Sequence, residues 1–151
     1  MLGSRALAAS AAVSLAAAVL LSVISGCGGS AAVSAEPEAK QRLTGLFQLY
    51  KFYCEKNKRA PANEQALRDF AKTLTPEERT SRKIGDDLEG IFVSPRDGEK
   101  FVIRYNLMVT GGGSSKGVAW EAKGKDGRRF VALLMGYVEE YSEPMFLEAT
   151  K

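Results

Sequence analysis

The chain has 151 residues, a formal net charge of +3 at neutral pH, two cysteines and no histidine. The absence of histidine excludes Ser-His-Asp and Cys-His hydrolases, histidine general bases and histidine-ligated zinc. The charges are nearly balanced and interspersed, which does not favour nucleic acid as a partner. We therefore predict a noncatalytic protein that needs no cofactor and no metal.

Residues 1–26 have the composition of a secretory signal peptide. They carry a single charged residue, Arg5, followed by an apolar run from Ala6 to Ile24 that is rich in Ala, Leu and Val. A short basic head, an apolar middle and a small-residue end are typical of a signal that is removed from the mature protein. A run of about 20 apolar residues also reaches across a bilayer, so an uncleaved anchor stays open as an alternative.

The apolar run ends in Ile24-Ser25-Gly26-Cys27. This segment resembles the lipobox of bacterial lipoproteins. The resemblance implies cleavage between Gly26 and Cys27 and attachment of acyl chains, such as palmitate, to the cysteine. Two or more acyl chains anchor a protein stably in membrane lipid. We therefore expect a lipid-anchored protein of the bacterial cell envelope, either at the outer membrane or on the periplasmic face of the inner membrane.

Residues 27–36 are mostly small, and their composition predicts a flexible tether ahead of a single domain formed by residues 37–151. If Cys27 carries lipid, Cys54 has no cysteine left to pair with. We interpret Cys54 as a buried apolar thiol, because a reactive thiolate needs a basic neighbour that lowers its pKa.

The first helix of this domain is indicated by apolar residues at three- and four-residue spacing from Leu43 to Cys54. We expect a long, buried helix that ends near Asn57. Pro37 lies between two glutamates, and we expect it in the first turn of this helix, where proline is tolerated.

Two shorter helices are expected next. Asn63 can cap a helix whose apolar positions are Leu67, Phe70, Ala71 and Leu74. The segment Thr75-Pro76-Glu77-Glu78 has the pattern of a capping box and opens a third helix toward Lys83. We interpret the basic cluster of Arg79, Arg82 and Lys83 as a solvated helix face, with an anion site as the alternative.

After Gly85 the pattern changes to that of strands. Residues 91–94 and 100–107 are predicted to pair as a hairpin around Pro95-Arg96-Asp97-Gly98. In the second of these strands Phe101, Ile103, Tyr105 and Leu107 share one face, which we expect to be buried.

The rest of the chain predicts a second hairpin and a terminal helix. Residues 118–122 and 129–137 are expected to pair around Asp126-Gly127, with the apolar run 130–135 covered on both faces and the first helix on one of them. Residues 138–141 continue that strand or form a short fifth one, and Ser142 caps a helix over 143–149. The predicted class is α+β, with helices packed on an antiparallel sheet of about four strands.

The glycine-rich segment 111–117 invites comparison with a phosphate-binding loop. Such a loop needs Gly before its lysine and a helix after it, whereas Ser115 precedes Lys116 here and the next segment has a strand pattern. Ser115 and Lys116 are adjacent on a loop and do not form a preorganised catalytic dyad. We interpret the segment as a connection between strands.

The order of these elements resembles the globular head of type II secretion pseudopilins. The resemblance rests on Asn57-Lys58-Arg59-Ala60-Pro61 between the first two helices and on the hairpin segment 94–105. The tail 128–139 resembles the end of the prepilin-type processing-associated domain. The aspartate and histidine of that family's last hairpin are Met135 and Tyr137 here, so their polar interaction is not expected in this chain.

These observations favour a structural or protein-interaction domain on the envelope, with an envelope or secretion-system protein as its possible partner. A small ligand- or metal-binding lipoprotein, accessory to transport or secretion, is the alternative, and a cavity lined by Trp120 and the tyrosines would favour it. A carboxylate-based hydrolase is a third hypothesis. The acidic residues that could bind calcium are interpreted as turn and cap residues: Asp86, Asp87, Glu89, Asp97 and Asp126.

Overall fold

The computed structural model describes residues 31–109 and 113–151. This part of the chain has an α+β fold with a four-stranded antiparallel sheet, which confirms the predicted class. In chain order its elements are α1 (Ala31–Asn57), α2 (Glu64–Lys72), α3 (Pro76–Arg82), the 3₁₀ turn η1 (Gly90–Phe92), β1 (Val102–Ile103), β2 (Gly117–Trp120), β3 (Arg128–Leu133), β4 (Val138–Ser142) and α4 (Glu143–Ala149).

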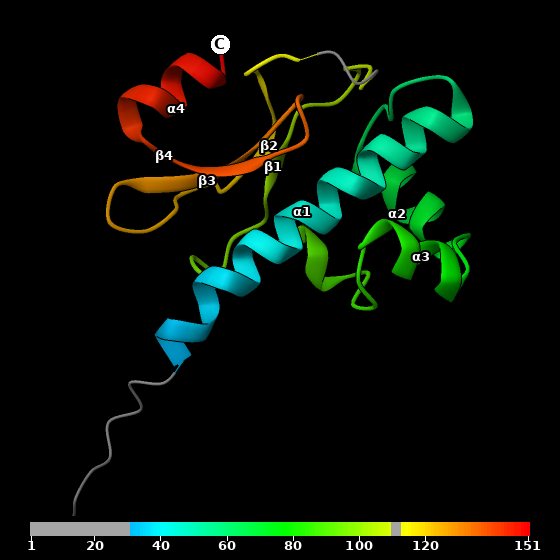
Figure 1. Ribbon diagram of the computed structural model, residues 1–151, viewed down its shortest axis with the longest axis horizontal. Coiled ribbons are helices and arrows are strands. Elements are labelled where there is room, and N and C mark those ends of the chain that lie inside the picture. The colour runs from blue at the N-terminus through cyan, green and yellow to red at the C-terminus, as the bar shows by residue number, and fades with distance from the viewer. Residues whose placement is uncertain (1–30, 110–112) are drawn as a thin grey trace, which may run out of the picture.

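Helix α1 lies at the centre of the fold (Figure 1). The sheet lies on one side of α1, α2 and α3 lie on the other side, and α4 covers the opposite face of the sheet. The strands are ordered β1-β2-β3-β4, so each strand pairs with its neighbour along the chain. This order needs only local connections between antiparallel strands.

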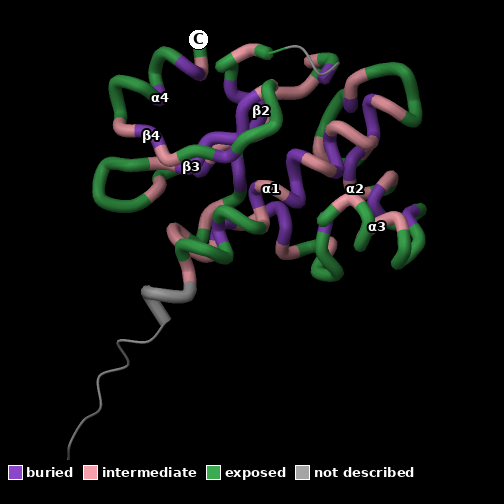
Figure 2. The backbone as a smooth tube through the Cα atoms, viewed as in Figure 1, coloured by how far each residue is buried: buried purple, intermediate pink, exposed green. Residues whose placement is uncertain are grey.

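Strand β3 is buried on both faces. Phe130 and Ala132 belong to the core that the sheet shares with α1, whereas Val131 and Leu133 belong to a smaller core beneath α4. The alternation follows from the two-residue period of a strand. Figure 2 shows the buried backbone concentrated where α1 faces the sheet and along β2 and β3. The expectation that this strand is covered on both faces is confirmed, with α4 as the second cover.

Helix α1 ends at Asn57 as predicted, but it begins earlier than expected. The helix starts at Ala31, so residues 31–36 of the expected tether are helical, and Pro37 lies inside the helix rather than in its first turn. Alanine has the highest helix propensity and no glycine occurs between Ala31 and Thr44, so the helix runs through this segment even though Pro37 cannot donate a backbone hydrogen bond.

The caps of α2 and α3 are as predicted. The Asn63 side chain accepts a hydrogen bond from the Ala66 amide at 3.0 Å. In the capping box of α3, the Glu78 amide donates to the Thr75 hydroxyl at 3.2 Å and the Thr75 amide donates to the Glu78 carboxylate at 3.0 Å. These bonds satisfy amides that a helix start leaves without partners.

The first predicted hairpin is only partly formed. Residues 90–92 form η1 instead of a strand, and the expected partners meet in a single bridge between Val93 and Lys100. The backbone of Gly90 is already engaged, because its amide donates to Asp87 Oδ1 at 2.8 Å and its carbonyl accepts from Arg42 Nη1 at 2.9 Å. These bonds hold the chain against α1 in a turn.

The second predicted strand is shorter than expected. Strand β1 covers only Val102–Ile103 and pairs with β2. Asn106 has a left-handed backbone with φ of 58°, and its amide donates to the Pro61 carbonyl at 3.0 Å, so the chain leaves the sheet there.

The last part of the sheet also differs in its strand limits. The expected strand 129–137 ends at Leu133, and β4 is a separate strand. Gly136, with φ of 99°, allows the tight reversal in which its amide donates to the Leu133 carbonyl at 2.9 Å. The Asp126-Gly127 turn joins β2 to β3 with positive φ at both residues, as a type I′ turn requires.

Candidate functional site

The predicted lipidation site lies outside the described residues. Gly26 and Cys27 fall within residues 1–30, so their predicted cleavage and acylation stay predictions. In residues 31–109 and 113–151, none of the helices combines the length and the apolar composition that crossing a bilayer requires.

The acidic residues considered as calcium ligands take part in turns and ion pairs. Asp97 accepts hydrogen bonds from the amides of Glu99, Lys123 and Gly124 at 3.0, 3.1 and 2.8 Å. Asp87 accepts from the Gly90 amide, as described above, and Glu89 pairs with the Arg68 guanidinium. Among the described residues, no group of three or more acidic or cysteine side chains is arranged to hold a metal ion.

The buried polar groups on α1 are held in their neutral forms. Burial raises the pKa of the Cys54 thiol, although a backbone hydrogen bond from Val109 opposes this. Burial also raises the pKa of Tyr50 to about 12, and its hydroxyl donates to the Leu107 carbonyl at 2.9 Å. At neutral pH neither group is an ionised nucleophile.

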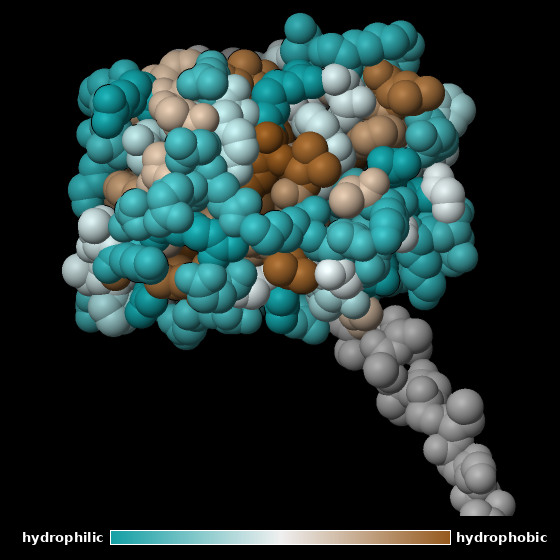
Figure 3. Space-filling model, turned by 180° about the vertical axis from the view of Figure 1, so that it is seen from behind, coloured by the Kyte–Doolittle hydropathy of each residue, from teal (hydrophilic) through white to brown (hydrophobic). Residues whose placement is uncertain are grey.

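Trp120 and its neighbours fill space instead of lining a hollow. The Trp120 ring meets the Phe146 ring edge-on at 6.0 Å, and the Arg104 guanidinium lies 5.6 Å from the Trp120 ring centroid. The contact between Trp120 and Phe146 closes the small core between the sheet and α4. On the face of the molecule shown in Figure 3, the surface is mostly hydrophilic, with smaller hydrophobic patches scattered over it.

A cavity of about 620 Å³ opens between the N-terminal half of α1 and the C-terminal end of α3. We call it the α1–α3 cavity. Its α1 wall is one face of the helix, because the contributing residues recur at three- and four-residue spacing. It is lined by Pro37, Lys40, Gln41, Thr44, Arg79, Thr80, Lys83, Gly85 and Asp86.

Basic side chains dominate the charge of the α1–α3 cavity, since three cations and one carboxylate line it. Arg79 Nη2 lies 3.9 Å from Asp86 Oδ1, too far for a hydrogen bond, and the Asp86 side chain is 91% exposed. Among the described residues, Lys40 and Lys83 form no ion pair.

The basic cluster predicted on α3 is therefore divided between two environments. Arg82 Nη1 donates to Glu55 Oε2 at 2.8 Å, and its guanidinium stacks on the Phe52 ring at 4.4 Å. Arg82 thus links α3 to α1 in a structural pair. Arg79 and Lys83 face the cavity instead.

A second, buried charged cluster was not predicted from the sequence. We call it the Arg96 cluster. The Arg96 side chain is 1% exposed and that of Glu121 is 0% exposed, and their Nη2 and Oε2 atoms are 3.2 Å apart. Arg96 Nη1 also donates to Glu140 Oε1 at 2.6 Å, and its guanidinium lies 4.4 Å from the Phe130 ring centroid.

The remaining acceptors of Glu121 are also occupied. Its Oε1 accepts from the Ser94 hydroxyl at 2.7 Å, and its Oε2 accepts from the Phe130 amide at 2.8 Å. The cluster therefore joins the 94–100 turn to β2, β3 and β4. The sequence signal for this cluster is an acidic residue, Glu121, next to the apolar residues of a strand, but its arginine partner is 25 positions away in a turn segment.

No protein-family model matches the chain, and comparisons with curated proteins and with solved structures find no significant match.

The Arg96 cluster and the α1–α3 cavity are the two charged sites considered for function, and their properties differ. In the Arg96 cluster the guanidinium is buried and paired with two carboxylates, while its Nε has no partner among the described residues; the α1–α3 cavity is open and has an excess of positive charge.

Proposed function

We propose that the chain is a noncatalytic envelope lipoprotein, anchored by acyl chains on Cys27, whose α+β domain serves as a structural or protein-interaction module. The observation that carries the proposal is the position of the lipobox cysteine just ahead of the domain. Cys27 lies four residues before Ala31, the first residue of α1.

This spacing holds the domain close to a membrane. Four residues reach at most about 14 Å when fully extended. From Ala31, the first residue of α1, to Ala39, its first residue in the core, the helix rises about 12 Å at 1.5 Å per residue. The folded body would then lie within about 26 Å of the lipid attachment point.

The roles of the acidic side chains support a noncatalytic domain. The residues that sequence analysis singled out as chemical candidates stabilise turns or form ion pairs, as Asp97 and Glu89 do. The deeply buried Glu121 is held by Arg96, Ser94 and the Phe130 amide. A carboxylate engaged in this way is a poor general base, because its lone pairs are already accepting hydrogen bonds.

The proposed partner is another envelope protein, and the resemblance to pseudopilin heads makes components of a secretion system the first ones to test.

A second candidate function, binding of a small ligand, is favoured by the α1–α3 cavity. A volume of about 620 Å³ lies within the range of ligand pockets.

The anchor is tested by comparing Cys27→Ser with Cys54→Ala in bacterial cells that express the full chain. Intact-mass spectrometry of the membrane fraction should show wild-type protein that lacks residues 1–26 and carries acyl chains. Cys54→Ala should be modified in the same way, because Cys54 is buried in the core. Cys27→Ser should keep its leader and carry no acyl group.

The proposal is wrong if the wild-type protein has an unmodified cysteine at position 27, or if Cys27→Ser is cleaved and retained like the wild type. Crosslinking in the same cells tests the interaction role. A defined envelope protein that crosslinks to wild type and is lost with Cys27→Ser would support it, and lipid contacts alone would favour an anchored domain without a protein partner.

A further inference from the structure

The α1–α3 cavity concentrates positive charge that the fold itself does not neutralise. Lys40, Arg79 and Lys83 line it against the single carboxylate of Asp86, which leaves a formal charge of +2. Among the described residues the Arg79 side chain donates no hydrogen bond, because its Nη2 atom lies 3.9 Å from Asp86 Oδ1 and its Nε, like that of Arg96, has no partner.

We propose that the α1–α3 cavity binds the phosphate monoester group of a ligand. Such a group carries a charge of about −1.5 to −2 at neutral pH and three acceptor oxygens. The charge matches the excess on the lining. The three cations come from α1, α3 and the residue after α3, and a phosphate group offers them three oxygens, whereas a carboxylate offers only two.

The local backbone is compatible with an anion at this place. The C-terminus of a helix normally repels anions because its last carbonyl groups are exposed. At the end of α3, the Thr80 carbonyl accepts from the Lys83 amide at 3.1 Å and the Arg79 carbonyl accepts from the Ile84 amide at 3.0 Å. These carbonyls are therefore already paired, and the side chains of Arg79, Thr80 and Lys83 form that wall of the cavity.

The backbone also holds the two walls together. Gly45 of α1 lets the Ile84 carbonyl approach so closely that an added Cβ would lie 2.6 Å from its oxygen. Ile84 is 1% exposed and packs in the core next to Lys83. The position of Lys83 relative to Lys40 is therefore set by packing, and the cavity does not depend on binding to bring its walls together.

Two sources of the phosphate group fit the position of the cavity. A soluble phosphate monoester can enter from solvent, because the cavity is open. A lipid with a terminal phosphate is the other source. This second source rests on the proposed function, because Lys40 lies 13 residues after Cys27 and would be close to the membrane surface if Cys27 is acylated.

The test uses the full chain in uncharged detergent micelles, so that lipidation is not needed to keep it in solution. Isothermal titration calorimetry measures the Kd for glycerol 3-phosphate and, separately, for micelles that contain phosphatidic acid or, as a neutral control, phosphatidylcholine. The mass of the same sample shows whether Cys27 is acylated, which separates failure of this proposal from failure of the lipid anchor.

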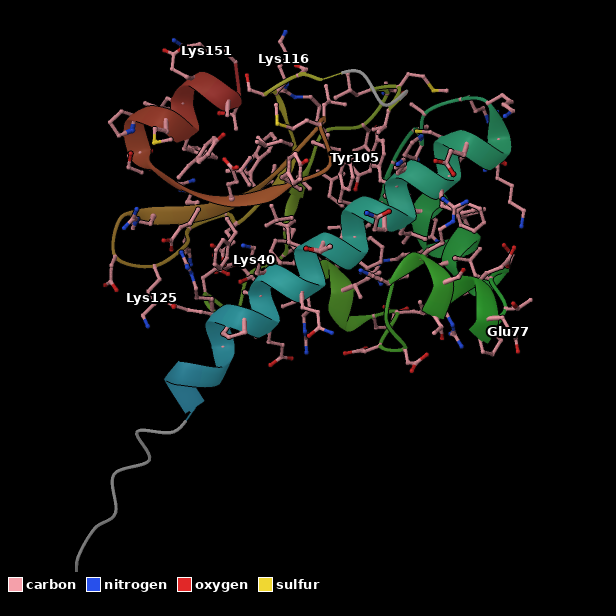
Figure 4. All side chains as sticks on the ribbon, viewed as in Figure 1. Lys40, Glu77, Tyr105, Lys116, Lys125 and Lys151 are labelled. Carbon is pink, nitrogen blue, oxygen red and sulfur yellow. The ribbon has the colours of Figure 1, made fainter. Side chains whose placement is uncertain are left out.

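The decisive variant is Lys40→Gln with Lys83→Gln, which removes two cations from the cavity and should weaken binding by about tenfold or more. The matched control is Lys116→Gln with Lys125→Gln. Lys116 precedes β2, and Lys125 lies in the turn between β2 and β3 (Figure 4). Both are exposed, neither lines the α1–α3 cavity, and in the described residues neither forms an ion pair, so the control removes the same charge elsewhere. It should change the Kd by less than about twofold, because salt screens distant exposed charges.

Asp86→Asn supplies an opposite expectation. Removing the one carboxylate of the lining should tighten binding several-fold, because Asp86 repels the phosphate and competes for Arg79. The proposal is supported with a soluble ligand if glycerol 3-phosphate binds most tightly to Asp86→Asn, less tightly to wild type and the control, and most weakly to Lys40→Gln with Lys83→Gln. It is supported with a lipid ligand if only micelles with phosphatidic acid bind in that order. Absence of both, or equal weakening by the control variant, overturns it.

Discussion

The Arg96 cluster and the α1–α3 cavity are both charged regions that contain an arginine, and they differ in how their charge is balanced. In the Arg96 cluster, the guanidinium is buried and faces Glu121 and Glu140 at 3.2 and 2.6 Å. In the α1–α3 cavity, the one carboxylate that Arg79 faces among the described residues is that of Asp86, at 3.9 Å. The side chains of Glu121 and Asp86 are 0% and 91% exposed, so the first pair is closed to water and the second is open.

This difference indicates what each cluster can do. A buried charge is tolerated only when neighbouring groups compensate for it, and the partners of Arg96 do so at the junction of the turn and the sheet. Arg79 is partly buried but lies beside two lysines that form no ion pair in the described residues, so this cluster keeps its capacity to bind an added anion. We therefore expect substitutions in the Arg96 cluster to change stability, and substitutions in the α1–α3 cavity to change binding.

The largest effect should come from Arg96→Leu. This change leaves Glu121 as a buried charge without its cation, and it should lower the free energy of unfolding by about 3 to 5 kcal/mol. The matched variant Arg79→Leu should cost less than about 1 kcal/mol, because its ion pair is long and exposed to solvent. Urea unfolding followed by Trp120 fluorescence measures both.

Equal losses for the two arginine variants would contradict the comparison. A double variant, Arg96→Leu with Glu121→Leu, refines it. Removing both charges replaces the pair with apolar side chains, so the double variant should be more stable than Arg96→Leu alone.

An intermediate effect is expected for Gly45→Ala, which tests how the walls of the α1–α3 cavity are held. Alanine favours a helix over glycine by about 1 kcal/mol, but its Cβ would lie 2.6 Å from the Ile84 carbonyl oxygen. Because overpacking costs about 1 to 3 kcal/mol, we expect a small net loss of stability and faster amide hydrogen exchange at Ile84. The control is Thr44→Ala, on the same turn of α1. It changes the helix propensity without adding a Cβ, so it should leave the amide hydrogen exchange at Ile84 unchanged.

The smallest effect concerns the pH dependence of α3, which forms one wall of the cavity. The hydrogen bond from the Thr75 amide, aided by Lys56, lowers the pKa of Glu78 in the folded protein. A carboxylate with a lowered folded pKa contributes stability above its unfolded pKa of about 4.3, and this contribution is lost as pH falls through the folded value.

Wild-type protein should therefore lose slightly more stability on acidification than Glu78→Gln does, as measured by urea midpoints at neutral and acidic pH. Glu139→Gln, an exposed strand residue without an ion pair in the described residues, serves as the control and should follow the wild type. If Glu78→Gln loses as much stability on acidification as the wild type does, the Glu78 carboxylate of the capping box does not cause this pH dependence.

Much of the fold was predictable because its signals are local. The spacing of Leu43 to Cys54 predicted a buried helix, and Asn63 and the Thr75–Glu78 box marked the starts of α2 and α3 correctly. The Asp126-Gly127 turn placed the second hairpin. Each of these features depends on residues a few positions apart, so the sequence contains all the information needed.

The predictions failed where distant residues decide the backbone. Ile91 and Phe92 have the composition of a strand, but the bond from Arg42 to the Gly90 carbonyl holds this segment against α1 as a turn. The predicted strand 129–137 failed for a local reason instead: Gly136 reverses the chain after Leu133, and the next residues return as β4, antiparallel to β3.

By itself the sequence determined the side-chain caps of α2 and α3, the Asp126-Gly127 turn and the apolar face of α1, because those features depend on neighbouring residues. The Ser142 side chain, by contrast, forms no capping hydrogen bond at the start of α4. Only the tertiary structure decided which charges meet. It brought Arg96 to Glu121 across the sheet and Arg79 and Lys83 to the face of α1 that carries Lys40. Electrostatic energy depends on distance and burial in space, and neither quantity can be obtained from separation along the chain.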